Sequence, residues 1–185
     1  MRVVGGSLKR RPIAAPEGLD VRPTSDRARE ALFNILAHRE DRPLIDARVL
    51  DVFAGSGALG IEALSRGAAH ATFIETLPQA LAAIRLNIGK LGLSEKATVL
   101  SRDALNPGPP PVGPMLPASL VFLDPPYRSG LAPKALRVLR SGGWLSPGAL
   151  VSVEVAATED LDPPEGLTVL DERRYGAAKL TLLIA

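Results

Sequence analysis

The chain has 185 residues, of which 46% are hydrophobic and 23% charged, values typical of one ordinary globular domain. It has no cysteine, which excludes disulfides, thiolate nucleophiles and cysteine-ligated metals, and its two histidines, His38 and His70, stand alone without a second metal ligand nearby. No apolar run reaches the roughly 18 residues of a membrane span, and the N-terminus lacks a secretory signal, so we expect a cytoplasmic protein.

The N-terminal segment differs from the rest of the chain in composition. Residues 1–23 mix short β-like pieces with glycine and proline, which predicts a small hairpin or extended arm. The net charge of the whole chain is only +2, yet the first eleven residues hold four basic residues and no acidic one. We therefore expect an N-terminal arm at 1–23 followed by a single domain at 24–185.

The domain opens with a predicted helix, for which Thr24 or Ser25 provides the N-cap and Asp26 suits the positive end of the helix dipole. Its predicted apolar face holds Ala28, Ala31, Leu32, Ile35 and Leu36.

From residue 48 onward, predicted strands and helices alternate. The strands are expected at 48–55, 71–75, 97–103, 119–124 and 149–156, and the helices at 58–67, 78–91 and 131–140. The last segment, 167–185, reads as two strands around a turn at Gly176. Such alternation predicts an α/β fold with a mostly parallel sheet and helices on both faces.

Two loops carry the candidate ligand chemistry at strand ends. The first is DVFAGSGALG at 51–60, in which Gly55, Gly57 and Gly60 follow the G-x-G-x-x-G spacing between a strand and a helix. Such glycines allow a ligand to approach the backbone closely. This loop suits either the pyrophosphate of a dinucleotide or S-adenosylmethionine, which has no phosphate but carries a cationic sulfur and an amino group.

Acidic residues help to choose between these two ligands. Glu75 follows the loop by about 20 positions and suits a ribose in either ligand, whereas Asp51 suits an ammonium group and Asp103 an adenine amine. Three strand-end carboxylates around one pocket favour a cationic, amine-bearing ligand over pyrophosphate.

The second loop is the stretch VFLDPPYRSG at 121–130. Asp124 ends a predicted strand, and Pro125 and Pro126 lack backbone N–H groups, so that hydrogen-bond acceptors dominate this turn. With Tyr127 beside it, the turn is suited to a ligand that carries N–H groups.

Together these segments resemble the bacterial RsmD-type family of Rossmann-like methyltransferases, which methylates the N2 amine of one guanine in 16S ribosomal RNA. Outside the two loops, the resemblance is carried by MRVVGG at the start, VRPTSDRAREALFNIL at 21–36 and GLTVLDERRYGAAKLTLL at 166–183. It spans nearly the whole chain and implies a seven-stranded sheet with an antiparallel C-terminal hairpin. The proline-rich stretch 106–117 departs from the family, where helical sequence is common, and we expect it to alter only the rim of the site.

The resemblance also implies roles for individual residues. Asp124 and the Pro125 carbonyl would accept the N–H groups of the target amine, Pro126 would stiffen the turn, and Tyr127 would stack on the base. S-adenosylmethionine, converted to S-adenosylhomocysteine without a metal, would contact Thr24, Asp51, Phe53, Ala54, Gly55, Gly57, Glu75, Thr76, Asp103 and Ala104.

The expected partner is 16S ribosomal RNA, within the small ribosomal subunit or an assembly intermediate, bound by a monomer that has no contact with membranes. Candidate RNA contacts are Arg2, Lys9, Arg10, Arg11, Arg22 and Arg128.

Three alternatives remain at this point. An adenine-N6 methyltransferase shares the Asp-Pro-Pro-Tyr turn, and a non-catalytic RNA-binding assembly factor could keep the same fold. A nicotinamide-dependent oxidoreductase fits the glycine loop, but hydride transfer gives no reason for the Asp124–Tyr127 turn.

Overall fold

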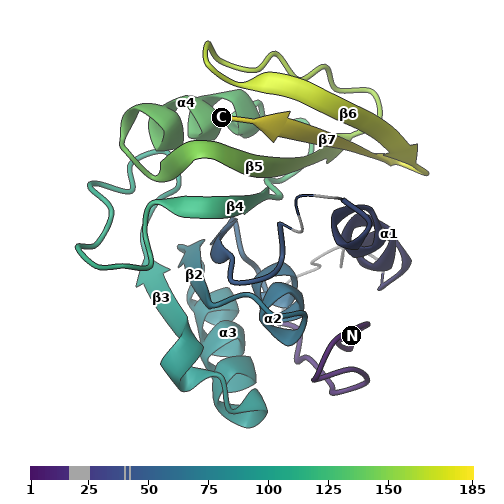
Figure 1. The fold of residues 1–185 in the computed structure, drawn as a ribbon, viewed down its shortest axis with the longest axis vertical. Helices are drawn as coiled ribbons and strands as arrows, with labels where there is room; N and C mark the ends of the chain where they lie inside the picture. Colours follow the sequence, from purple (N-terminus) through teal and green to yellow (C-terminus); the bar gives the residue numbers. More distant parts are fainter. Residues whose placement is uncertain (17–25, 40, 42) are drawn as a thin grey trace.

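A seven-stranded sheet forms the centre of the protein (Figure 1). The computed structural model describes residues 1–16, 26–39, 41 and 43–185. The strands are β1 (Arg48–Val52), β2 (His70–Glu75), β3 (Ala97–Ser101), β4 (Ala118–Leu123), β5 (Leu145–Ala156), β6 (Thr168–Tyr175) and β7 (Ala178–Ile184). Their order is β3-β2-β1-β4-β5-β7-β6, and β7 runs antiparallel to both of its neighbours. The α/β class and the antiparallel C-terminal hairpin are confirmed.

Helices cover both faces of this sheet (Figure 1). They are α1 (Asp26–Ala37), α2 (Ala58–Ser65), α3 (Pro78–Leu91) and α4 (Leu131–Ser141), with a short 3₁₀ turn, η1, at Ser94–Lys96. The first three helices pack on one face, where the rings of Phe33 and Phe122 lie 5.4 Å apart. On the other face, α4 packs with the fully buried Trp144. None of the helices in the described parts of the chain is long and apolar enough to cross a membrane.

Most predicted elements form close to their expected positions, with two instructive differences. Strand β1 ends at Val52 because Phe53 takes a positive φ of 59°, which turns the chain into the glycine loop before residue 55. In α1, Arg29 and Phe33 are fully buried, whereas Ala31 and Ile35 of the predicted apolar face are only partly covered. The predicted caps Thr24 and Ser25 lie outside the described residues.

The proline-rich stretch 106–117 forms no helix, as predicted, and lies on the same face of the sheet as α4. Leu105 just before the stretch and Leu116 near its end pack against the core of that face. Arg102 Nη1 donates to the carbonyls of Pro107 and Pro109, both at 2.8 Å, and Trp144 Nε1 donates to the Gly108 carbonyl at 3.0 Å. These two side chains therefore satisfy carbonyls in a segment whose prolines offer few N–H groups.

The N-terminal arm forms the predicted hairpin over its described part. Arg2 pairs antiparallel with Pro12, and Val3 N–H donates to the Arg11 carbonyl at 2.9 Å. The hairpin lies along α2 and α3: Leu8 N–H donates to Ser65 Oγ at 2.9 Å, and Ala14 N–H donates to Asn87 Oδ1 at 2.8 Å.

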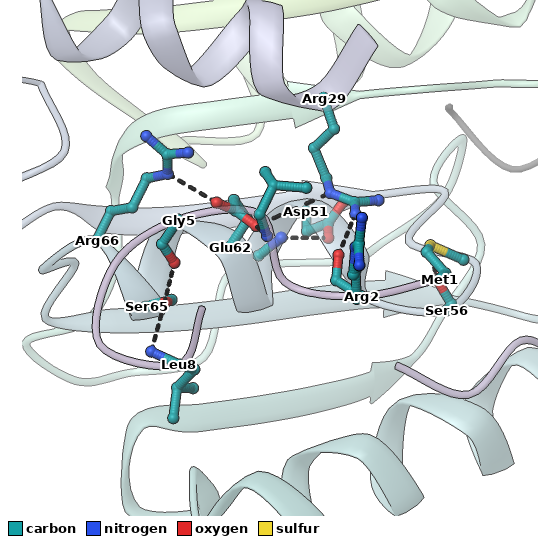
Figure 2. Close-up of polar contacts among 12 residues, drawn as sticks. Met1, Arg2, Gly5, Leu8, Arg29, Asp51, Ser56, Glu62, Ser65 and Arg66 are labelled. Atoms are coloured by element: carbon teal, nitrogen blue, oxygen red, sulfur yellow. Dashed lines mark hydrogen bonds and ion pairs between the residues drawn. The ribbon is translucent and has the colours of Figure 1, made fainter. Parts of the chain in front are cut away.

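A buried carboxylate joins the arm to two helices (Figure 2). Glu62 of α2 has no solvent exposure; its Oε2 accepts from Val4 N–H at 2.8 Å, and its Oε1 accepts from Arg66 Nε at 2.7 Å. The equally buried Arg29 of α1 places Nε 3.9 Å from Glu62 Oε2 and donates through Nη2 to the Arg2 carbonyl. Glu62 is thus the point where arm, α1 and α2 meet.

We expect Glu62→Ala to destabilise the protein by about 3–5 kcal/mol, because it removes the buried carboxylate that faces Arg29 and the acceptor for Val4 N–H. Urea unfolding at neutral pH measures the loss. The matched control is Glu95→Ala in η1, where the glutamate is exposed and the change should stay within about 0.5 kcal/mol. Equal stability of the two variants would contradict a central role for Glu62.

Candidate functional site

Four carboxylates lie in a row where neighbouring parallel strands end. Glu75 ends β2, Asp51 lies in β1, Asp124 follows β4, and Glu154 lies near the end of β5. The register pairs Asp51 with Phe73 and with Phe122, which are two residues before Glu75 and Asp124. Since side chains alternate along a strand, all four carboxylates project toward the face that α1, α2 and α3 cover, with Asp51 one step deeper.

Asp51 is almost fully buried, with 1% of its surface exposed. Its Oδ2 accepts from Gly60 N–H at 2.8 Å, in the first turn of α2. Burial raises the pKa of Asp51 well above 3.8, and repulsion from Asp124 and Glu75 raises it further, against the opposing effect of the Gly60 hydrogen bond. A positively charged ligand placed beside Asp51 would offset the repulsion among these three carboxylates.

Glu75 shapes the glycine loop. Its Oε2 accepts from Gly55 N–H at 2.9 Å, while Oε1 accepts from the N–H groups of Thr76 at 2.7 Å and Leu77 at 3.0 Å. An ionised carboxylate offers about four lone-pair positions, so at least one remains for a hydroxyl group of a ligand. Glu75 therefore fixes the conformation of the glycine loop and retains one acceptor position for a hydroxyl group of a ligand.

Every second residue at the start of the glycine loop is left-handed. Phe53, Gly55 and Gly57 have φ values of 59°, 55° and 77°. Ala54 is buried and donates its N–H to the Ile74 carbonyl at 3.2 Å, which joins the loop to β2. A Cβ at Gly60 would lie 2.4 Å from Phe73 Cε1, so only glycine allows α2 to pack this closely on the sheet.

The remaining predicted cofactor residues lie further along the same edge. Asp103 is exposed just after β3, and its Oδ1 accepts from Leu105 N–H at 2.9 Å, within its own turn. Ala104 beside it is buried, and Thr76 is exposed. Thr24 and Arg22 lie outside the described residues.

The Asp124–Arg128 turn lies directly beside the glycine loop. Asp124 N–H donates to the carbonyl of Val52, the last residue of β1, at 3.3 Å. Pro125 is buried and Pro126 exposed, and the half-buried Tyr127 donates its hydroxyl to Glu154 Oε1 at 2.6 Å. Arg128 is exposed, with its N–H bonded to Glu159 Oε2 at 2.7 Å.

A pocket of about 480 Å³ opens next to this turn. Small residues leave the space, and one aromatic and one cationic side chain border it; the lining is Tyr127, Arg128, Ala156, Ala157, Thr158, Gly176 and Ala177. The pocket therefore combines a ring for stacking with a cation, which suits a nucleotide.

The structure separates the basic arm residues from this edge. Lys9, Arg10 and Arg11 lie near the tip of the hairpin, where Arg11 Nη2 donates to the carbonyl of Lys90 at 3.0 Å, in the last turn of α3. That helix runs antiparallel to the strands, so its end lies at the sheet edge opposite the carboxylates. Arg2 lies nearer the site, since Met1 before it contacts Ser56 of the glycine loop (Figure 2).

The predicted set omits two residues that contact the Asp124–Arg128 turn, Glu154 and Glu159. Glu154 was detectable, because it is a carboxylate near the end of a buried strand, the feature that identified Asp51, Glu75 and Asp124. Glu159 lies in a connection of ordinary composition, and the sequence carries no signal for its contact. No group of three acidic or histidine residues suited to a metal ion occurs in the part of the chain that the structure describes.

Comparisons with known proteins agree over almost the entire chain. A family model described as conserved hypothetical protein 95 matches residues 1–184. The Haemophilus influenzae protein named ribosomal RNA small subunit methyltransferase D is 38% identical over 186 residues, covering 98% of this chain and 92% of that protein.

Solved structures show the same relationship. A putative methyltransferase from Escherichia coli, yhhF, is 37% identical with a TM-score of 0.83, covering 100% of this chain and 97% of its own. An RNA methyltransferase from Salinibacter ruber, solved with S-adenosyl-L-homocysteine, has a TM-score of 0.64 over 88% of this chain and 92% of its own; at 18% identity it shows a shared fold. With its seven-stranded sheet, its glycine loop and these matches, the chain belongs to the RsmD-type family of methyltransferases.

Proposed function

We propose that this protein transfers a methyl group from S-adenosylmethionine to the exocyclic N2 amine of a guanine in 16S ribosomal RNA. One observation carries the proposal: the hydrogen bond from Asp124 to Val52 puts an acceptor-rich turn next to a loop suited to a cationic cofactor. The names of relatives such as the Haemophilus influenzae protein support ribosomal RNA as the substrate.

The residues of the site fit S-adenosylmethionine. Its sulfonium and ammonium groups are positive, and such charges would offset both the burial of Asp51 and its repulsion by Asp124 and Glu75, which together raise its pKa. Glu75 keeps a lone pair free for a ribose hydroxyl, and Asp103 at the end of β3 is exposed for an adenine amine.

The cofactor supplies an electrophilic methyl group, and the Asp124–Tyr127 turn prepares the nucleophile. The lone pair of an aromatic amine is delocalised into its ring, which makes the amine a poor nucleophile. When the Asp124 carboxylate and the Pro125 carbonyl accept its two N–H bonds, the nitrogen becomes pyramidal and its lone pair is aimed at the methyl carbon. As the N–C bond forms and the S–C bond of the cofactor breaks, leaving S-adenosylhomocysteine, these acceptors would stabilise the positive charge on nitrogen, and the Asp124 carboxylate would take the proton that the methylated nitrogen loses. Tyr127 would stack on the extruded base.

The decisive experiment identifies the methylated nucleoside. The protein is incubated with labelled S-adenosylmethionine and small ribosomal subunits, and the RNA is then digested; we expect label in N2-methylguanosine.

The rate of label transfer in the same assay tests the catalytic turn. Asp124→Ala should lower this rate by about 10²–10³-fold, since it removes a group that stabilises developing charge, while cofactor affinity stays near native.

Each alternative gives a different result in this assay. Label in N6-methyladenosine would replace the guanine assignment, and absence of label from all nucleic acid would favour an assembly factor. A rate for Asp124→Ala within a few-fold of native would remove Asp124 from the proposed acceptor role.

We expect Asp51→Asn to change stability and cofactor binding in opposite directions: the variant should be more stable at high pH and bind S-adenosylmethionine more weakly. Because burial raises the pKa of Asp51, ionisation of this residue opposes folding; the cost is fully present above the raised pKa, shrinks as the pH falls from there toward 3.8, and is absent below 3.8. The variant keeps an acceptor for Gly60 N–H, so it should unfold at higher urea than native at pH 8, with a gap that narrows as the pH falls. Calorimetry should show about ten- to a hundredfold weaker S-adenosylmethionine binding. Native affinity in this variant would exclude Asp51 from the site.

The arm prediction concerns Lys9, Arg10 and Arg11. If they contact phosphates, replacing all three with alanine should weaken RNA binding and flatten the plot of log affinity against log salt by about two units. Cofactor affinity should not change, because the hairpin tip lies at the opposite sheet edge. Lys134→Ala/Arg137→Ala on the solvent side of α4 is the control, and an equal slope change in both variants would mean that the arm makes no specific contact.

A further inference from the structure

Two segments meet beside the proposed base-binding pocket. One is the Asp124–Arg128 turn after β4, and the other is the stretch 154–159, which ends β5 and begins the next connection. The parallel register pairs Leu123 with Val153, so the turn and this stretch leave the sheet side by side. Two glutamates, neither of which the sequence pattern singled out, join these segments.

The first contact holds the Tyr127 ring. Its hydroxyl donates to Glu154 Oε1 at 2.6 Å, a length typical of an O–H group bonded to a carboxylate. Burial raises the pKa of Glu154, while the hydrogen bond from Tyr127 acts in the opposite direction by favouring the ionised form. A ring tied at both its Cβ and its hydroxyl has little freedom to rotate away from the pocket that it borders.

The second contact holds the backbone of the turn. Arg128 has a φ of 56°, in the left-handed region that disfavours residues with a side chain. Glu159 Oε2 accepts from Arg128 N–H at 2.7 Å and from Ala156 N–H at 2.9 Å. One carboxylate oxygen therefore fastens a strained residue of the turn to the end of β5.

From these contacts we infer that Glu154 and Glu159 are positioning residues that hold Tyr127 and Arg128 in the arrangement that receives the target nucleotide. The inference rests on the proposed function, in which Tyr127 contacts the base. Neither glutamate contacts the reacting atoms; both act through the turn. Placement of a reacting group to within about 0.5 Å requires such supporting contacts.

A double-mutant cycle tests the Glu154 contact. Glu154→Ala and Tyr127→Phe each remove the same hydrogen bond, so each should lower kcat/KM for RNA by about tenfold, and the double variant should fall no further than the worse single one. Glu154→Gln keeps an oxygen acceptor and should stay within about threefold of native. The affinity for S-adenosylmethionine, measured by calorimetry, should be native in all of them.

The Glu159 contact is tested through the strain that it holds. Glu159→Ala should lower kcat/KM by about tenfold in the native background but by less than about threefold when combined with Arg128→Gly, because glycine adopts a positive φ without strain. Glu165→Ala, at an exposed glutamate of the same connection, is the matched control and should leave the rate unchanged.

The outcomes distinguish this inference from the proposed function. Absence of methyl transfer by the native protein would overturn both, whereas native transfer with additive losses in the Glu154–Tyr127 cycle would overturn only the positioning role. The positioning role would also be overturned if Glu154→Gln lost as much activity as Glu154→Ala. Equal losses from Glu159→Ala in the native and Arg128→Gly backgrounds would overturn it as well. Urea unfolding of every variant identifies losses that arise from misfolding.

Discussion

Negative charge concentrated at one edge of the sheet is the constraint around which the site is built. Burial raises the pKa of Asp51, and the neighbouring Asp124 and Glu75 carboxylates raise it further. Backbone N–H groups compensate part of this charge: Gly60 donates to Asp51, and Gly55 donates to Glu75. The glycine loop and the start of α2 therefore take their shape from carboxylates that they partly neutralise, and the remaining charge is available to a cationic ligand.

The two loops that flank this charge share one structural device. In each, a residue other than glycine takes a left-handed conformation where the chain leaves a strand: Phe53 after β1 and Arg128 in the turn after β4. In each, a glutamate from the neighbouring strand or its extension binds a backbone N–H of the loop, Glu75 at Gly55 and Glu159 at Arg128. Conformations of this kind persist only where surrounding contacts over-determine them, and they are concentrated at functional sites.

The fold was predictable because its strands, helices and turns are encoded in local patterns, and the same patterns place acidic residues at the strand ends. Strands that end in a carboxylate identified Asp51, Glu75 and Asp124, and glycine and proline marked the loops between them. The buried cluster around Glu62 was not predictable in the same way, because Arg29 and Val4 reach it from 33 and 58 positions away. The buried face of α1 was predicted incorrectly for a related reason: hydrophobic periodicity assigns only apolar residues to the core, whereas the charged Arg29 is part of it. Long-range polar contacts thus mark the limit of the sequence analysis.

The position of the arm constrains the substrate. Glu62 and Ser65 fasten the hairpin along α2, so its basic tip is fixed at the sheet edge opposite the Asp124–Arg128 turn. The two edges are separated by the length of the strands, about 15–20 Å for five or six residues. A single nucleotide bound in the pocket would not reach from Tyr127 to Lys9, whereas a strand of several nucleotides would span that distance. If the arm and the pocket both bind the proposed RNA substrate, that RNA must extend along one side of the protein from the Asp124–Arg128 turn to the hairpin tip.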